Sequence, residues 1–335
     1  MNVIYKLFLA AVAALFVSVG VSAASLDEIQ KQARQGDAES QFELAQRYAA
    51  GKDVTQDLAQ AAEWFLKAAQ QGHAKAKTNL GNLYRFGKGV RQDDAEAIRW
   101  YRSAAQAGDN KARINLGLMY LSGIGVNKDA DQGIRWLSQA ADAGDVQAMV
   151  HLGTSYMAGT LVSKDPVRAV NWFRRAADKG DPFAQHSLGL AYHSGTGVAK
   201  DEIASLQWHR KAADQGFPPA QFSLALRYAK GQGVGQDYAQ AADWYGKAAR
   251  AKHAGAQNNL GLLYRDGRGV KQDYRQAEAW FRQAAEHGFP PAQYNLGRMY
   301  LEGLGVDKDP AEAKAWISKA ADAGHKGAKK ALAGM

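Results

Sequence analysis

The amino-acid sequence predicts an all-α solenoid of eight helical hairpins, each 36 residues long, with a capping helix at each end. Three observations lead to this fold class. All eight tryptophans of the 335-residue chain lie 36 residues apart, from Trp64 to Trp316. A tyrosine recurs with the same period from Tyr48 to Tyr300, with a leucine four residues before it and a glycine three residues after it. No insertion or deletion interrupts this lattice, so each period is one unit that stacks on its neighbours.

The first segment, residues 1–23, has the pattern of a secretory signal peptide. One charge, Lys6, precedes an apolar run of 13 residues from Leu7 to Val19, and small residues then lead to Ala23. This pattern predicts export and cleavage after Ala23. The alternative is an uncleaved membrane anchor, because Leu7 to Ala24 nearly reaches the roughly 20 residues that a spanning helix needs. Nothing later in the sequence approaches a spanning segment, so we expect a mature chain without one that is periplasmic or, alternatively, secreted.

Composition excludes several classes of protein. With 46% hydrophobic residues, the chain is too apolar to be disordered. The absence of cysteine excludes disulfides, thiolate zinc sites and thiol nucleophiles, so packed side chains alone must stabilise the fold. Without Lys6, 41 basic residues stand against 33 acidic ones, a net charge of +8. This excess suits an anionic partner, such as peptidoglycan or an anionic envelope surface.

Two short segments flank the repeats and are expected to cap them. Residues 24–36 contain the stretch from Leu26 to Gln35, which has the pattern of a lone second helix and predicts an N-terminal capping helix. Residues 37–324 hold the eight repeats, and residues 325–335 form a C-terminal capping half-repeat. Repeat arrays need such polar-faced ends to stay soluble.

Each repeat is predicted to be two helices joined by a tight turn, as the second repeat illustrates. Ala76, Leu80 and Tyr84 have the i, i+4, i+8 spacing of one helix face, in a first helix that ends near Gly87. Gly87 and Gly89 can then take positive φ angles and reverse the chain. The second helix carries an apolar face of alanines around Trp100 and ends near Gly108.

An aspartate recurs at the predicted start of every second helix. These residues are Asp57, Asp93, Asp129, Asp165, Asp201, Asp237, Asp273 and Asp309. Six of them have glutamine or glutamate three residues later, which is the capping-box spacing. In a capping box, the carboxylate accepts a backbone N–H and the later side chain reaches back to the first residue. A catalytic or metal-binding row of acids is the alternative, but capping accounts for the spacing fully.

Two further lattice positions are also assigned to structure. The tryptophans are expected in the core between successive hairpins rather than in a row that stacks ligands. A glycine follows the leucine in most repeats, as Gly81 does, although glycine inside a helix is unfavourable. Its recurrence predicts a close helix contact there.

The repeat resembles the Sel-one-like repeat family, a branch of the tetratricopeptide superfamily. In the second repeat the motif consists of Ala76, Leu80, Gly81, Tyr84, Gly87, Gly89, Val90, Asp93, Ala97, Trp100, Ala104, Ala105 and Gly108. The resemblance implies a right-handed α-solenoid whose first helices line a concave groove that binds proteins or peptides, often in bacterial envelopes or on secretion. Leu161 departs from the pattern at the second glycine of the fourth turn, and Lys252 at the last glycine of the sixth repeat.

By analogy with tetratricopeptide helices, the groove is expected to be lined by first-helix positions close to the repeated leucine. These positions lie one residue before it, two residues on either side of it and five residues after it. The candidate groove residues are Asn79, Asn82, Arg85, Asn115, His186, His193, Asn259, Arg265, Asn295 and Arg298. Amides can pair with a peptide backbone, and arginine can bind a carboxylate with two hydrogen bonds. Alternatively, the asparagines bond to the neighbouring helix and fix the stacking.

The motifs of common enzymes are missing from the sequence: HExxH, the phosphate loop, GxSxG and Ser-x-x-Lys. His186 and His193 lie about 10 Å apart along a helix, too far to share one metal. We therefore expect no enzyme activity, no cofactor and no metal. Nucleic acid is not an expected partner, because the chain is predicted to be exported and its basic residues form no run.

The sequence thus predicts an exported scaffold or adaptor that binds a protein or peptide in the concave groove. A secreted effector that binds a host protein is an alternative. A cell-wall protein that binds peptidoglycan or accompanies a hydrolase is another.

Overall fold

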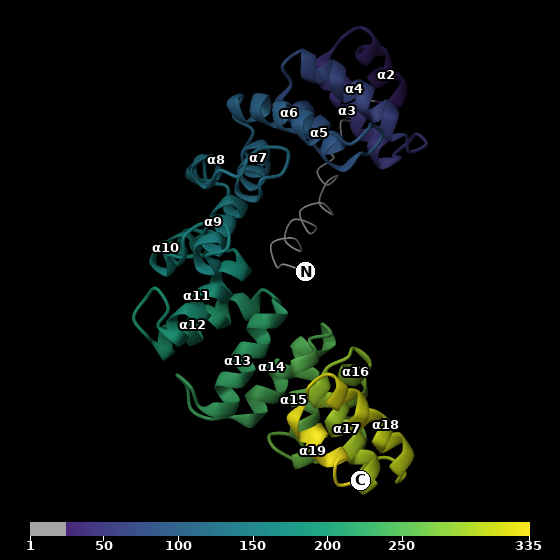
Figure 1. The fold of residues 1–335 in the computed structure, drawn as a ribbon, viewed down its shortest axis with the longest axis vertical. Helices are drawn as coiled ribbons and strands as arrows, with labels where there is room; N and C mark the ends of the chain where they lie inside the picture. Colours follow the sequence, from purple (N-terminus) through teal and green to yellow (C-terminus); the bar gives the residue numbers. More distant parts are fainter. Residues whose placement is uncertain (1–24) are drawn as a thin grey trace. The chain divides into compact units, whose positions relative to one another are not determined.

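The structure is a computed structural model that describes residues 25–335, which form eighteen α-helices and no strands (Figure 1). The predicted signal peptide lies outside the described residues. Each helix from α3 to α18 is 13 residues long, so the 36-residue period of the sequence is also the period of the structure. The predicted all-α solenoid is confirmed. Between residues 25 and 335, no helix is both long enough and apolar enough to cross a membrane.

The chain divides into two compact units, of which the first ends at Lys164. The described part of this unit holds the N-terminal helix, three complete hairpins and the first helix of the fourth repeat (Figure 1, purple to teal). Its helices are α2 (Leu26–Arg34), α3 (Ala38–Ala50), α4 (Leu58–Gln70), α5 (Ala74–Phe86), α6 (Asp94–Gln106), α7 (Asn110–Ser122), α8 (Ala130–Asp142) and α9 (Val146–Ala158). Each helix packs mainly against the helices before and after it in the sequence.

The second unit begins at Asp165 and holds the second helix of the fourth repeat, four complete hairpins and a short final helix (Figure 1, teal to yellow). Its helices are α10 (Pro166–Asp178), α11 (Pro182–Ser194), α12 (Glu202–Asp214), α13 (Pro218–Lys230), α14 (Tyr238–Arg250), α15 (Ala254–Asp266), α16 (Tyr274–Glu286), α17 (Pro290–Glu302), α18 (Pro310–Asp322) and α19 (Lys326–Leu332). Successive helices again pack on one another.

The centre of each hairpin is filled by the residue that follows the tryptophan. In the second repeat, Tyr101 is 1% exposed, whereas Trp100 beside it is only half-buried. Six tryptophans belong to the core clusters: Trp244 and Trp316 are buried, and Trp64, Trp100, Trp136 and Trp280 pack against the clusters from outside. The expectation that tryptophan forms the middle of the core face was therefore wrong in register by one residue. The reason is that Ala97, Tyr101 and Ala104 form the buried i, i+4, i+7 stripe.

This buried residue also explains the glycine after the leucine. A Cβ added to Gly81 would lie 2.7 Å from the ring of Tyr101, and one added to Gly261 would lie 2.7 Å from the ring of Phe281. The predicted close approach is confirmed. In these repeats the close contact is between a glycine of the first helix and a side chain of the second helix.

In six of the eight hairpins, the turn brings a glycine against the preceding repeat. Gly89 has φ +71°, and a Cβ there would lie 2.1 Å from the carbonyl oxygen of Leu58 at the start of α4. The same close approach recurs in other repeats, for example between Gly269 and Tyr238. In the fourth turn Leu161 takes this place without adopting a positive φ, so that turn has a different backbone.

Glutamines connect successive repeats in a way that the sequence did not reveal. Gln221 lies three residues before the repeated leucine and donates its Nε2 to the carbonyl oxygen of Ala213, near the end of the preceding second helix, at 3.3 Å. Gln185 and Gln293 make the same bond one repeat before and two repeats after. Each glutamine is a second donor to a carbonyl at the helix end, which also accepts the backbone N–H of the glycine three residues later.

The recurring aspartates are N-caps, as predicted. Asp93 Oδ1 accepts the backbone N–H of Glu96 at 2.9 Å, and its seven counterparts accept in the same way. The second hydrogen bond predicted for the capping box, from the backbone N–H of Asp93 to the side chain of Glu96, is wrong. The N–H of Asp93 donates instead to the carbonyl oxygen of Tyr84 at 2.9 Å, which closes the hairpin and leaves no bond for the Glu96 side chain to make there.

Replacing Asp93 with alanine is expected to lower the free energy of unfolding by about 1 kcal/mol, because α6 then loses the acceptor for its first turn. Urea unfolding followed by tryptophan fluorescence measures the change. Asp93→Asn keeps an oxygen acceptor and is expected to retain most of the stability. Equal losses in the two variants would contradict the capping role.

Candidate functional site

In the first unit, two candidate asparagines belong to a hydrogen-bond network that connects two repeats. Asn82 Oδ1 accepts the hydroxyl of Tyr101 at 2.7 Å and Nδ2 of Asn115 at 3.2 Å. Burial raises the pKa of Tyr101, so its hydroxyl stays protonated and donates. Asn82 and Asn115 therefore join α5, α6 and α7. These contacts fit the alternative in which asparagine fixes the stacking.

The other two candidates of the first unit lie on α5. Arg85 is half-buried, and its Nη1 lies 2.9 Å from Asp94 Oδ1 at the start of α6. Asn79 is half-buried one residue before the repeated leucine. Arg85 thus closes its own hairpin by an ion pair.

A second amide network occupies the matching place in the sixth to eighth repeats. Asn259 donates Nδ2 to the hydroxyl of Tyr245 at 3.1 Å, and its Oδ1 accepts Asn258 Nδ2 at 3.1 Å. Asn295 donates to Asn258 Oδ1 at 2.9 Å. Burial raises the pKa of Tyr245 to about 12. In both units, a buried tyrosine of a second helix is thus hydrogen-bonded to an asparagine of a first helix.

His186 contacts a histidine that the sequence did not single out. His209 occupies the buried position after Trp208, is 0% exposed, and places its Nδ1 3.2 Å from Nδ1 of His186. Its Nε2 is buried without a hydrogen-bond partner. Burial, together with the nearby His186, Arg227 and His193, lowers the pKa of His209 to about 2. Burial, together with His253, lowers the pKa of His186 to about 4.

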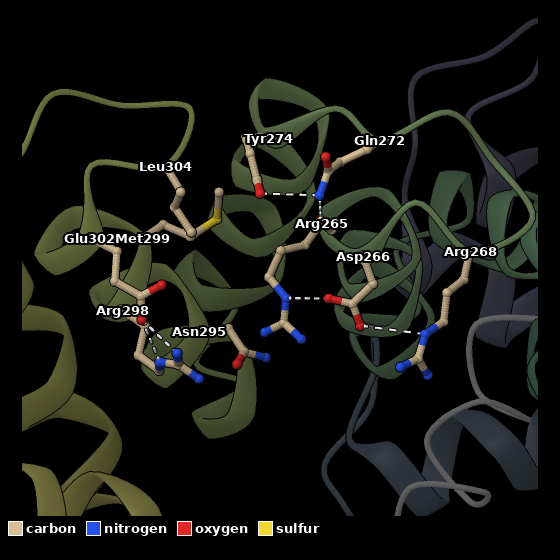
Figure 2. A pocket seen from close by; sticks show the side chains of 10 residues that line it. All are labelled: Arg265, Asp266, Arg268, Gln272, Tyr274, Asn295, Arg298, Met299, Glu302 and Leu304. Atoms are coloured by element: carbon tan, nitrogen blue, oxygen red, sulfur yellow. Dashed lines mark hydrogen bonds and ion pairs between the residues drawn. The ribbon is translucent and has the colours of Figure 1, made fainter.

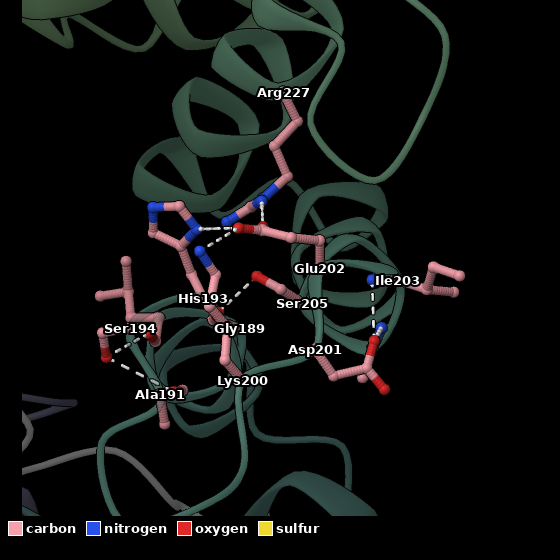
Figure 3. A network of polar contacts seen from close by, with 12 residues as sticks. Gly189, Ala191, His193, Ser194, Lys200, Asp201, Glu202, Ile203, Ser205 and Arg227 are labelled. Carbon is pink, nitrogen blue, oxygen red and sulfur yellow. Dashed lines mark hydrogen bonds and ion pairs between the residues drawn. The ribbon is translucent and has the colours of Figure 1, made fainter.

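His193 belongs to an ion-pair network around Glu202 (Figure 3). Glu202 accepts His193 Nδ1 at 3.0 Å and Arg227 Nη1 at 2.7 Å, and Lys200 Nζ lies 3.3 Å away. Desolvation alone would raise the pKa of Glu202, but these three donors hold it at about 2. The network joins α11, α12 and α13. Among residues 25–335, no three His, Asp or Glu side chains are grouped so that they could hold a metal ion.

The remaining candidates meet in a pocket of about 380 Å³ between the seventh and eighth repeats (Figure 2). The lining residues are Arg265, Asp266, Arg268, Gln272, Tyr274, Asn295, Arg298, Met299, Glu302 and Leu304. Arg265 Nε lies 2.7 Å from Asp266 Oδ1, and Arg298 Nη2 lies 2.5 Å from Glu302 Oε1. Figure 2 shows the amide of Asn295 between the two guanidinium groups. The pocket therefore gathers three predicted groove residues.

An apolar row leads to this pocket through the second unit. Two residues after the repeated leucine, successive first helices carry Leu190, Leu226 and Leu262, and then Arg298. Leu190 is 47% exposed, and the next two leucines are half-buried. We call Leu190, Leu226 and Leu262 the leucine row.

Comparison with known proteins identifies the repeat. The Sel1 repeat model matches eight consecutive segments, residues 38–73, 74–109, 110–145, 146–181, 182–217, 218–253, 254–289 and 290–325. The chain belongs to the Sel1 repeat family. No functionally curated protein matches the chain.

Two solved Sel1 repeat structures are similar over nearly the whole chain. One is c5321, a protective antigen of uropathogenic Escherichia coli with an SLR fold, at 36% identity and a TM-score of 0.82. That match covers 92% of this chain and 66% of c5321, so the chain spans just under two thirds of that relative. The other is a Sel1 repeat protein from Oxalobacter formigenes, at 34% identity and a TM-score of 0.77, covering 95% of both chains. Sel1 repeat solenoids are typically scaffolds for protein–protein interaction and are generally not enzymes.

The polar groups that the sequence missed in this Sel1 repeat protein share one property. His209, Glu202 and Arg227 occupy lattice positions whose residue type varies between repeats. The signal for His209 was available, since the residue after tryptophan is aromatic or aliphatic in the other seven repeats. The signal for Glu202 was its place after the N-cap aspartate, where Asp94 stands in the second repeat.

Proposed function

We propose that this Sel1 repeat protein is an exported scaffold or adaptor that binds a protein or peptide segment on the first helices of its second unit. The observation that carries the proposal is the leucine row. At this position Leu190 is 47% exposed, and Leu226 and Leu262 are half-buried against the core clusters, so each leaves apolar surface that the isolated chain does not cover. An amphipathic helix or an extended segment could cover such a row with its own apolar side chains.

The first unit supports the choice of the second as the binding surface. At the same lattice position it carries Gln46, Asn82, Leu118 and Thr154. Leu118 is buried, and Asn82 is held within the fold. The first unit therefore lacks a comparable apolar row among its described residues.

Crosslinking inside cells, followed by mass spectrometry, tests the proposal. We expect the wild-type protein to capture a partner that is lost from Leu190→Gln/Leu226→Gln/Leu262→Gln, because glutamine already stands at this position as Gln46. The matched control is Val167→Gln/Ile203→Gln, which removes two side chains that are 59% and 63% exposed elsewhere in the unit.

Far-UV circular dichroism verifies that all variants keep their helices. The single variant Leu190→Gln changes the most exposed leucine and is expected to weaken capture in the same direction. Equal capture by the wild type and every leucine-row variant would contradict the proposed surface.

The export step of the proposal is tested separately. The mature chain is expected to begin at Ala24 and to accumulate in the periplasm, which fractionation and intact-mass measurement determine. Accumulation in the medium would favour a secreted effector instead. Sedimentation of the purified protein with sacculi would favour cell-wall binding, to which the net charge of +8 is suited.

A further inference from the structure

We infer that the pocket between the seventh and eighth repeats binds a carboxylate of the segment that covers the leucine row. The carboxylate can be the side chain of an aspartate or glutamate, or the C-terminus of the bound chain. This inference rests on the proposed function, because it names the chemistry of one end of the bound segment.

The donors of the pocket are held in place by groups of the same helices. Asp266 binds Nε of Arg265, which leaves both Nη atoms of that arginine available. Glu302 Oε1 binds Nε and Nη2 of Arg298 at 3.1 and 2.5 Å, which leaves Nη1. Figure 2 shows both guanidinium groups on the same side of the helices as the Asn295 amide. The acids therefore orient the arginines, and a ligand need not order them.

The charges of the pocket favour a single negative charge. Three arginines line it, at positions 265, 268 and 298, against two carboxylates, Asp266 and Glu302, so the net charge is 3 minus 2, or +1. The hydrogen bond to Glu302 raises the pKa of Arg298, which stays charged. This excess positive charge attracts an anion, and a carboxylate matches it in magnitude.

Helix ends would normally oppose an anion here, because the C-terminus of α15 carries partial negative charge. Its last carbonyl groups already accept hydrogen bonds. The carbonyl oxygen of Leu263 accepts the N–H of Arg268, that of Tyr264 accepts the N–H of Asp273, and that of Arg265 accepts Nε2 of Gln272. These bonds offset the unfavourable field at the pocket.

The leucine row fixes where the carboxylate sits in the bound segment. Arg298 occupies the lattice position that Leu262 occupies one repeat earlier, so a segment that follows the row reaches the arginine after its last apolar contact. The expected ligand is therefore an apolar segment with a carboxylate at the end that meets the eighth repeat.

Fluorescence anisotropy with three rhodamine-labelled peptides tests this. The first is Leu-Ala-Ala-Leu-Ala-Ala-Leu-Glu with an amidated C-terminus, and the second ends in Gln with a free carboxylate. The third ends in Gln amide and carries no carboxylate. We expect at least one carboxylate peptide to bind the purified protein about tenfold more tightly than the third, and the preferred one identifies the source of the carboxylate.

The arginine variant is Arg265→Ala/Arg298→Leu, since the lattice carries Ala229 and Leu262 at the same positions. It is expected to bind all three peptides with the affinity that the wild type shows for the uncharged one. The control Arg91→Ala/Arg99→Ala removes two exposed arginines of the first unit and should keep the tenfold preference.

The failures of the two proposals are distinguishable. Equal binding of the three peptides to the wild type, abolished by the leucine-row variant, would overturn the carboxylate pocket and leave the proposed function standing. A carboxylate preference that persists in the arginine variant would also overturn the pocket. Absence of binding by every peptide would count against the leucine row and the pocket together.

Discussion

Gly89→Ala is expected to lower the free energy of unfolding by about 3 kcal/mol or more. A side chain at φ +71° costs roughly 1–2 kcal/mol, because a Cβ there approaches the following carbonyl. The same Cβ would also lie 2.1 Å from the carbonyl oxygen of Leu58, which forces the second repeat away from the first and adds about 1–3 kcal/mol. Urea unfolding measures the loss, and hydrogen exchange of α4 and α6 locates it.

Gly108→Ala separates the two causes of this loss. Gly108 has φ +91°, but a Cβ there would meet no atom within 4 Å. We expect it to cost only the conformational part, about 1–2 kcal/mol. Lys252 occupies the equivalent position of the sixth repeat with φ +62°, so the chain itself contains a side chain there. If Gly89→Ala costs no more than Gly108→Ala, the contact with Leu58 does not limit this position.

The second large effect is expected on acidification. His186 and His209 keep pKa values of about 4 and about 2 in the fold, against about 6.5 in the unfolded chain. Because the folded pKa values are lowered, the unfolded chain binds more protons below pH 6.5. The stability is therefore complete above that pH and falls as the pH decreases, by about 2 kcal/mol for each histidine between pH 6.5 and 4.5. Unfolding in urea at a series of pH values measures this slope.

A variant that copies the first repeat tests the assignment. His186→Phe/His209→Phe reproduces the pair Phe42 and Phe65, whose ring centres are 5.8 Å apart. Its loss of stability between pH 6.5 and 4.5 is expected to be smaller by about 4 kcal/mol than that of the wild type. His151, which is also buried with a pKa lowered to about 4, stays in both proteins and cancels from the difference. An unchanged slope would mean that the histidine pair does not control acid stability.

The pH window ends at 4.5 because carboxylates titrate below it. The pKa of Glu202 is held at about 2 in the fold, so the contribution of its pairing with Arg227 and His193 to stability falls as the pH decreases through 4.5, its usual pKa, and below. Above pH 4.5 the histidines therefore dominate the slope.

Periodicity predicted the hairpins, their turns and their N-caps. The boundaries of the hairpins, the positive φ of Gly87 and Gly89 and the N-cap role of Asp93 all follow from residue types that the lattice holds constant. The same argument placed Trp100 at the centre of the core. A residue type that recurs in every repeat indicates that its surroundings are alike in all repeats, but it does not say how deeply the side chain is buried. The variable neighbour Tyr101 is the more deeply buried of the two.

The candidate site was less predictable for the opposite reason. Asn82 and Asn259 lie where expected on the first helices, but their partners are Tyr101 and Tyr245 on second helices, at a position whose residue changes from repeat to repeat. Such pairs depend on side-chain contacts across two helices and leave no periodic signal. The gathering of Arg265 and Arg298 in one pocket likewise depends on side-chain directions, which the spacing of 33 residues does not specify.

The sequential packing of the helices makes the length of this protein easy to change during evolution. Within each of the two units, a helix rests mainly on its neighbours in the sequence. Recombination between equivalent codons of two repeats would therefore remove or insert whole periods of 36 residues, and the newly joined neighbours would meet through an interface of the kind already present. The gene can thus lengthen or shorten its surface in fixed steps, and each repeat can diverge while its neighbours keep the array folded.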